Sequence, residues 1–311
     1  MINIYLSSPR GFCAWVHRAL NILNGALQKY GAPIFVNHEI IHNKLIVDYY
    51  KKKWVIFEEK LENIPKNSIM IFSAHWVSPK YIQKVKENWL KYIDASCPLV
   101  LKVHWEVKIY LKKWYKIIYI WQKNHQEALW VLWEWDNDIY IVSNKEDVDN
   151  IFWKLKNNKL VLLTQTTLSL SDKEKLEKYI FKKFSNIEKP PASDICFATT
   201  NRQNAVKKMI EITNIDSLII VWSKNSSNSN KLKNIWEKAG IKSVLVDSFD
   251  DLENDFFEQV NNLWISSWAS VSHELVIDVI EKIKQNHNWK LVEEINVAKE
   301  NVDFSFDLEF K

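Results

Sequence analysis

Short apolar segments alternate along the whole chain with longer amphipathic ones. Examples of the short segments are SIMIFSAH at 68–75, KIIYIW at 116–121 and KLVLLTQTTLS at 159–169. Between such segments lie stretches with apolar residues at helical spacing, such as 16–31 and 272–285. A helix between two strands is the connection that parallel pairing requires. The alternation therefore predicts an α/β protein with mainly parallel sheets.

The three cysteines, Cys13, Cys97 and Cys196, divide the chain at nearly even intervals. Each follows a predicted strand and precedes a helical segment. Because parallel α/β sheets bind ligands at the carboxyl ends of their strands, the spacing predicts three similar units that deliver one thiol each to a common centre. The predicted units span 14–96, 97–195 and 196–290, the last together with the strand at 1–13, and 291–311 form a C-terminal tail.

Three thiols admit more than one role. Three unrelated buried cysteines are the simplest alternative. A structural zinc site normally has four ligands, and the chain has no CxxC pair. An iron–sulfur cluster held by three cysteines would leave one iron open to a substrate. A thiol at the start of a helix is also expected to have a lowered pKa, which favours metal binding.

Composition and charge exclude several classes of protein. The formal net charge is +4, with lysines spread over predicted helix faces, which indicates a solvated surface rather than a nucleic-acid site. No apolar run reaches the roughly 18 residues of a membrane span, and the start MINIYLSSPR has no signal-peptide pattern. Three cysteines cannot form a paired disulfide framework. We therefore expect a cytoplasmic protein that contacts neither membrane nor nucleic acid.

Imidazole, hydroxyl and amide groups gather at the predicted strand ends. His42, His75 and His125 lie at strand–loop junctions, and further donors follow later strands: Ser226, Ser227, Asn228 and Ser270. Together with helix N-termini, such groups suit a phosphate or diphosphate, although a single histidine is more often structural. No GxxxxGK[ST] loop is present. Glu127 follows His125 closely and has the chemistry of a proton donor, although its spacing alone favours an ordinary surface carboxylate.

These segments together resemble one enzyme family over nearly the whole chain. The matching segments are PRGFCA (9–14), APIFVNHEIIHN (32–43), IFSAHWVS (71–78), DASCPLVLKVH (94–104), KNHQE (123–127), TQTTLS (164–169), DICFATTNRQ (194–203), SKNSSNSN (223–230) and WAS (268–270). In length and order they resemble the LytB-type 4-hydroxy-3-methylbut-2-enyl diphosphate reductases of the non-mevalonate isoprenoid pathway. Gln126 departs from the family pattern, which has proline there.

The resemblance implies a trefoil of three α/β units around a 4Fe–4S cluster held by Cys13, Cys97 and Cys196. It implies that Thr166 lies near the substrate hydroxyl and that Glu127 feeds a proton relay. It also implies a diphosphate pocket lined by His42, His75, His125, Ser226, Ser227, Asn228 and Ser270. Two electrons would arrive from a small carrier of the ferredoxin or flavodoxin type. Isopentenyl and dimethylallyl diphosphate would be the products.

Tryptophan is the abnormal residue in this composition, with 16 Trp and only 4 Gly. Average usage would give about 22 glycines. Family glycines correspond to eleven tryptophans: Trp15, Trp54, Trp76, Trp89, Trp114, Trp121, Trp130, Trp133, Trp222, Trp264 and Trp268. We interpret the gene as one from an organism that reads UGA as glycine, translated as though UGA meant tryptophan. Trp15, Trp76, Trp222 and Trp268 are then expected to crowd the central pocket, some with positive φ.

Two alternatives differ in class from an iron–sulfur reductase. The first is a non-catalytic protein that binds metal or nucleic acid through lysines and a stacking platform of tryptophans. The second is an inactive paralogue in which the tryptophans are real. Cluster assembly under anaerobic conditions is expected for the reductase and not for the non-catalytic binding protein. The codons at the tryptophan positions distinguish the reductase from the inactive paralogue.

Overall fold

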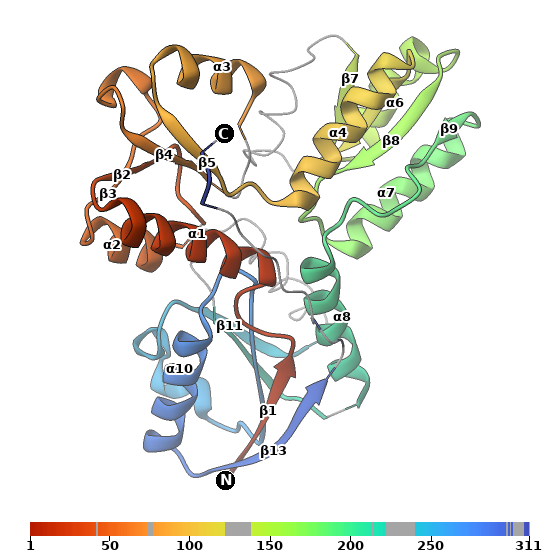
Figure 1. Cartoon of the computed structure of the whole chain (residues 1–311). Helices are drawn as coiled ribbons and strands as arrows, with labels where there is room; N and C mark the ends of the chain where they lie inside the picture. Colours follow the sequence, from red (N-terminus) through yellow and green to blue (C-terminus); the bar gives the residue numbers. More distant parts are fainter. Residues whose placement is uncertain are drawn as a thin grey trace.

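Three parallel sheets form three lobes around a common centre in the computed structural model (Figure 1). Every strand pair in the three sheets is parallel, which confirms the predicted α/β class. The structure describes residues 1–41, 43–73, 77–121, 138–212, 214–221, 240–296, 298, 300 and 308–310.

The first sheet has the strand order β3-β2-β4-β5. Its strands are β2 (Ile34–Val36), β3 (Val55–Phe57), β4 (Ile69–Phe72) and β5 (Lys91–Asp94), and the helical segments around them are α1 (Ala14–Tyr30), α2 (Lys44–Lys51), η1 (Leu61–Asn63) and α3 (Pro79–Glu87). Ile34 and Val36 pack on the α1 side, whereas Phe35 joins Val85 of α3 on the other. Helices thus bury both faces, as parallel sheets require.

The second sheet has the order β7-β6-β8-β9. Its elements are α4 (Pro98–Lys112), β6 (Lys116–Ile120), β7 (Ile139–Val142), α6 (Lys145–Leu155), β8 (Leu160–Thr164), α7 (Leu170–Lys183) and β9 (Ile187–Glu188). Val103 and Val107 of α4 cover one face of the sheet. Side chains of α6 and α7, among them Val148 and Ile180, cover the other face.

The third sheet has the order β11-β10-β12-β1-β13 and joins both ends of the chain. Its elements are β1 (Ile2–Ser8), α8 (Phe197–Ile212), β10 (Ser217–Val221), β11 (Lys242–Val246), η2 (Phe249–Asp251), η3 (Asn254–Phe257), β12 (Asn262–Ser267), α10 (His273–Asn286) and β13 (Trp289–Asn296). Residues 291–296 of the predicted C-terminal tail belong to strand β13, which pairs with β1. The predicted unit boundaries themselves stay a prediction.

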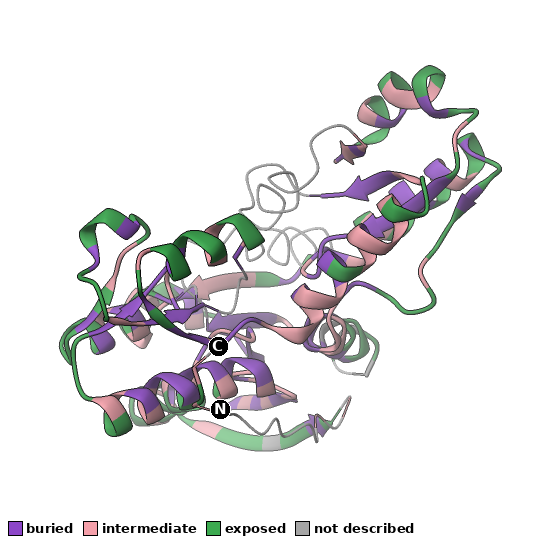
Figure 2. Cartoon of the chain, turned by 45° about the horizontal axis from the view of Figure 1, so that its top comes forward, coloured by how far each residue is buried: buried purple, intermediate pink, exposed green. Residues whose placement is uncertain are grey.

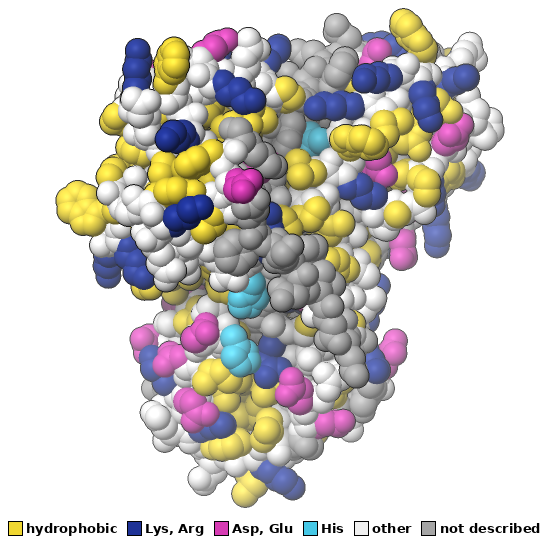
Figure 3. Space-filling view, in the orientation of Figure 1, with side chains coloured by type: hydrophobic (Ala, Val, Ile, Leu, Met, Phe, Trp, Pro, Cys, Tyr) yellow, Lys and Arg dark blue, Asp and Glu magenta, His cyan; other side chains and the backbone are white. Residues whose placement is uncertain are grey.

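Buried positions concentrate on the strands and on the inner faces of the helices (Figure 2). Several helices start at a Ser or Asn whose side chain accepts a hydrogen bond from an amide three residues further on, which satisfies a donor of the first turn. Examples are Asn43 before α2, Ser78 before α3 and Ser272 before α10. On the face seen in Figure 3, lysine and arginine side chains are scattered, with acidic side chains between them. None of the helices described is long and apolar enough to cross a bilayer.

Among the described tryptophans that match family glycines, three have positive φ, but they are not among the four expected at the pocket. They are Trp54 (φ 61°), Trp89 (φ 58°) and Trp114 (φ 65°), which follow the ends of α2, α3 and α4. Trp15 lies in α1 and Trp268 follows β12; both are buried, and neither has positive φ. Trp76 and Trp222 lie outside the described residues. At the described tryptophans, positive φ therefore occurs at helix ends, where glycine is the usual residue.

Candidate active site

Each of the three cysteines stands where a helix begins, as predicted from the sequence, and Figure 1 shows these helix starts near the centre of the molecule. Cys13 and Cys97 are the N-cap residues of α1 and α4, and Cys196 directly precedes α8. The sulfur of Cys13 and that of Cys97 accept hydrogen bonds from the amides two and three residues further on. The Thr199 amide donates to Cys196 Sγ at 3.3 Å. Three different lobes thus supply equivalent thiol environments.

Burial raises the pKa of all three thiols, contrary to the lowered pKa expected at a helix N-terminus. The effect takes the pKa of Cys97 to about 12. Loss of solvent is the largest cause, and the amide hydrogen bonds oppose it only in part. Cys13 and Cys196 also repel the Cys97 thiolate, so the three sulfurs lie near one another. Three such thiolates need a positively charged partner.

The three cysteines have the donor chemistry of an iron–sulfur site. In the part of the chain that the structure describes, no three His, Cys, Asp or Glu side chains form a group able to hold one metal ion. An iron–sulfur cluster is larger and is held by cysteine thiolates, and amide hydrogen bonds to its sulfurs are typical. The donor set, its burial and its amides fit such a group. The ligand role of the three cysteines stays a prediction.

Thr166 lies beside one of these cysteines. It follows β8, is 4% exposed, and its carbonyl oxygen accepts a hydrogen bond from the Cys196 amide at 2.9 Å. The Thr164 amide, two residues earlier, donates to Asp194 at 2.8 Å. The end of β8 and the approach to α8 are therefore held together, and Thr166 is placed next to the thiol centre.

Ser270 belongs to a loop that contacts two other parts of the site. Its carbonyl oxygen accepts a hydrogen bond from Asn43 Nδ2 at 2.8 Å, and Asn43 directly follows His42. The neighbouring Ala269 carbonyl accepts a hydrogen bond from the Cys13 amide at 3.2 Å. The loop after β12 thus joins the Cys13 segment to the segment that follows His42.

Seven further predicted site residues lie outside the described residues: His42, His75, His125, Glu127, Ser226, Ser227 and Asn228. The strands that lead into three of their segments are described. Strand β4 ends before His75, β6 before the segment of His125, and β10 before the segment of Ser226. At the end of β4, the Ser73 amide donates to Asn37 Oδ1 at 2.8 Å, which ties two strand ends together.

Asn37, Asn43 and Arg202 lie in segments that match the family and make hydrogen bonds around the candidate site, but they were not predicted individually from the sequence. Asn43 directly follows the predicted site residue His42, and this position was the signal that could have identified Asn43. Arg202 lies in α8 beyond the first helical turn and is almost fully buried at 2% exposure. Arg202 lies in DICFATTNRQ, one of the segments that match the family, but the sequence does not show its partners, because they come from distant parts of the chain.

Comparison with known proteins gives matches along nearly the whole chain. A family profile described as "LytB protein" matches residues 4–284. The 4-hydroxy-3-methylbut-2-enyl diphosphate reductase of Haemophilus influenzae (strain PittGG) is 39% identical over 313 residues, which cover 100% of this chain and 98% of the relative. The protein of the same name from Wigglesworthia glossinidia brevipalpis is 41% identical over 286 residues, covering 91% and 90%.

A solved structure agrees with these sequence matches. It is described as the E-1-hydroxy-2-methyl-but-2-enyl-4-diphosphate reductase from Plasmodium falciparum. Its TM-score is 0.90 at 35% sequence identity, over 98% of this chain and 95% of that chain. The likeness therefore extends to the arrangement of all three lobes.

Three parallel α/β lobes that each bring one helix-start cysteine to a shared centre define a class of proteins built as a trefoil. Within that class, the profile and the full-length relatives identify the family. The chain belongs to the LytB family.

Proposed function

We propose that this chain reductively removes the hydroxyl group of 4-hydroxy-3-methylbut-2-enyl diphosphate. The products are isopentenyl diphosphate and dimethylallyl diphosphate, in the last step of the non-mevalonate isoprenoid pathway. The observation that carries the assignment is the full-length match to curated reductases at 39% identity. The chain is an oxidoreductase, and two electrons and two protons convert the hydroxyl group to water and leave a new C–H bond.

The cofactor of this proposal is a 4Fe–4S cluster bound by Cys13, Cys97 and Cys196. Support comes from three half-buried cysteines whose thiolates repel one another and from the amides that donate to them. When bound, the cluster supplies electrons and one iron without a protein ligand. The helix-start amides lower the energetic cost of three half-buried thiolates.

The substrate contacts of this proposal are those implied by the family resemblance. The diphosphate is bound by His42, His75, His125, Ser226, Ser227, Asn228 and Ser270. Thr166 contacts the substrate hydroxyl, and Glu127 donates the proton that completes the product. The Asn43–Ser270 hydrogen bond and the Thr166–Cys196 hydrogen bond support this assignment, since they couple predicted substrate segments to each other and to the thiol centre.

Electrons reach the site from a small carrier of the ferredoxin or flavodoxin type, and the reaction takes place in the cytoplasm without membrane or nucleic acid. The formal net charge of +4 supports an acidic protein as the partner, because opposite charge favours encounter.

In the cellular protein, glycine stands at most of the eleven tryptophan positions that match family glycines, because the organism reads UGA as glycine. Positive φ at Trp54, Trp89 and Trp114 supports this, since a non-glycine residue rarely adopts it. We call the chain with glycine at all eleven positions the glycine-restored chain. UGA codons at these positions, with UGG at genuine tryptophans, are the expected result of sequencing the gene. UGG at Trp54, Trp89 and Trp114 would refute the recoding.

The test of function uses the glycine-restored chain, reconstituted with iron and sulfide in the absence of oxygen. It should bind a cluster and consume the substrate when a reduced carrier is supplied. Each of Cys13→Ser, Cys97→Ser and Cys196→Ser should lose the cluster, because each removes one of three protein ligands. Iron content and visible absorption measure this, and unchanged iron in one variant would remove that cysteine from the site.

A further inference from the structure

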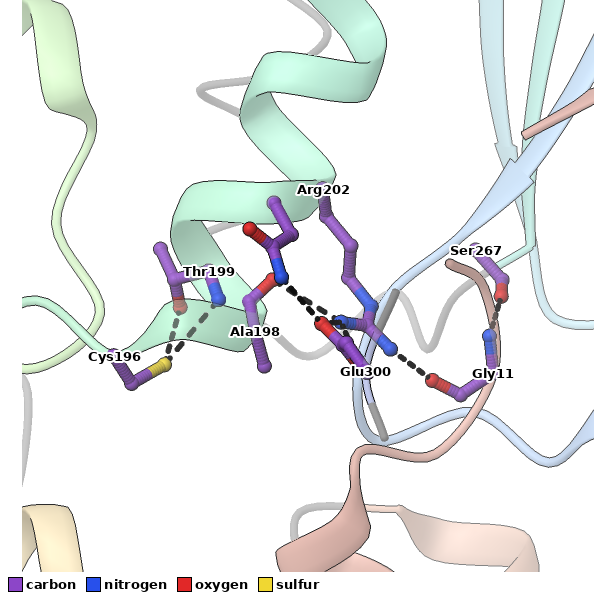
Figure 4. Close-up of polar contacts among 8 residues, drawn as sticks. Gly11, Cys196, Ala198, Thr199, Arg202, Ser267 and Glu300 are labelled. Atoms are coloured by element: carbon purple, nitrogen blue, oxygen red, sulfur yellow. Dashed lines mark hydrogen bonds and ion pairs between the residues drawn. The ribbon is translucent and has the colours of Figure 1, made fainter. Parts of the chain in front are cut away.

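Arg202 of α8 is a buried arginine that joins three distant segments beside the thiol centre (Figure 4). Its Nη1 donates to the Ala198 carbonyl at 3.1 Å and to Glu300 Oε1 at 3.0 Å. Its Nη2 donates to the Gly11 carbonyl at 2.6 Å. The Arg202 side chain is 2% exposed and that of Glu300 is 10% exposed, so the ion pair is shielded from water.

The contacts of Arg202 reach the segments of two of the three cysteines. Gly11 lies two residues before Cys13, and its amide donates to Ser267 Oγ at 2.7 Å. Ala198 lies two residues after Cys196 in the first turn of α8. One guanidinium therefore ties the loop of one cysteine to the helix of another, and Glu300 fixes that guanidinium from the C-terminal segment.

The two charges of this pair lie beside the thiol centre. The Arg202 guanidinium contacts the backbone two residues before Cys13 and two residues after Cys196. The Glu300 carboxylate is held next to it by Arg202 and Asn201. The two partners of one ion pair thus place opposite charges in the same network.

We propose that Arg202 is a positioning residue for the cluster and that it fixes the Cys13 loop against α8. Its permanent positive charge favours the reduced state of the cluster. The negative charge of Glu300 has the opposite effect. This inference rests on the proposed cluster at the three cysteines. Each electron added to a buried cluster adds negative charge in a medium of low dielectric constant, where a nearby cation stabilises it. Arginine suits this role because it stays protonated.

The test compares Arg202→Gln, Arg202→Lys and Glu300→Gln in the glycine-restored chain. The measurements are the reduction potential of the reconstituted cluster and the rate of iron release to a chelator. Arg202→Gln should disfavour reduction by about tenfold, which is 59 mV for one electron. It should also release iron roughly 10- to 100-fold faster, the usual cost of losing a residue that orients a metal ligand. Arg202→Lys should keep the potential closer to that of the unmodified chain.

Glu300→Gln is the decisive variant, because it breaks the same ion pair but removes the negative partner. It should shift the potential in the direction opposite to Arg202→Gln. Lys183→Gln is the control, since Lys183 pairs with Asp149 at 2.8 Å and joins α7 to α6 in the second lobe, outside this network. It should change neither quantity.

The outcomes separate this inference from the proposed function. A glycine-restored chain that binds no cluster overturns both. A bound cluster with potentials that shift in the same direction in Arg202→Gln and Glu300→Gln overturns the charge role. Iron release in Arg202→Gln that equals that of Lys183→Gln overturns the positioning role, while the cluster itself stands.

Discussion

Trp54, Trp89 and Trp114 occupy equivalent places at the ends of three helices. The amide of each donates to the carbonyl three residues earlier, at 3.0 to 3.1 Å, and each side chain is at least 70% exposed. A left-handed backbone at a helix end is the position where glycine is favoured, because it has no Cβ to clash. The exposed indoles have little apolar contact to offset that conformational cost.

Glycine at these positions is therefore expected to stabilise the protein. Trp54→Gly, Trp89→Gly and Trp114→Gly should each raise the free energy of unfolding by about 1 kcal/mol, since left-handed backbone costs an L-residue roughly 1–2 kcal/mol. Urea unfolding measures this. Trp153→Gly is the control: Trp153 is 75% exposed within α6, where glycine should destabilise by roughly 0.5 kcal/mol. The same sign at all four positions would contradict the explanation.

Glu127 carries the proton in the proposed reaction. Glu127→Gln should keep the cluster and the substrate affinity but slow turnover by about 10²- to 10⁴-fold, the usual contribution of general acid catalysis. Single-turnover kinetics with pre-reduced enzyme measure the step. Turnover equal to that of the unmodified enzyme would show that the proton comes from another group.

At the scale of elements, α4 is anchored to the segment that leads into α8. Lys102 of α4 donates to Asp194 at 2.8 Å and pairs with Glu106, one helical turn further on, at 3.0 Å. Loss of solvent is the main reason why the pKa of Glu106 rises to about 7, and the Asp194 carboxylate also raises this pKa. The Cys97 helix and the approach to Cys196 thus share one lysine between two carboxylates, of which Asp194 is buried and Glu106 is half-buried.

This arrangement predicts a pH dependence of stability. The folded-state pKa of Glu106 lies above its ordinary value of 4.5, so the folded protein holds the extra proton between about pH 4.5 and 7. The contribution of Glu106 to stability should therefore fall as the pH rises through this window. Relative to Glu106→Gln, the unmodified chain should lose roughly 1–2 kcal/mol between these limits. Urea unfolding of both proteins at several pH values checks this; parallel curves would exclude it.

At the scale of the whole molecule, the C-terminal residues return from the third lobe to the first. The Tyr30 hydroxyl of α1 donates to the Leu308 carbonyl at 2.7 Å, and the rings of Tyr30 and Phe310 are 4.8 Å apart. Leu308 also lies over Gly25, where an added Cβ would stand 2.9 Å from Leu308 Cδ1. Gly25 therefore permits close contact between α1 and the C-terminal segment.

Removal of residues 308–311 should destabilise the chain by about 1–2 kcal/mol, because apolar contacts of Leu308 and Phe310 with α1 are lost. Gly25→Ala in the shortened chain should stabilise α1 by about 1 kcal/mol. In the full chain the same substitution should gain less or destabilise, since its Cβ displaces Leu308. Urea unfolding of the four proteins measures this cycle, and an equal effect of Gly25→Ala in both backgrounds would argue against the contact.

The local sequence pattern was enough to predict the fold class and part of the candidate site. The alternation of strands and helices depends on residues close in sequence, so it predicted the parallel α/β sheets. The place of each cysteine before a helix was equally local, and the structure confirms it. The excess of tryptophan over glycine was visible in composition alone.

Only the tertiary structure decided which residues surround the thiols. Arg202 and Gly11 are 191 positions apart, and Arg202 and Glu300 are 98 apart, so no local pattern could join them. Burial likewise reversed the expected direction of the thiol pKa, because loss of solvent outweighs the helix-start amides. The structure also showed that the tryptophans with positive φ lie at helix ends. The sequence by itself determined which elements form, whereas the charges, contacts and solvent exclusion at the site depend on how distant elements pack.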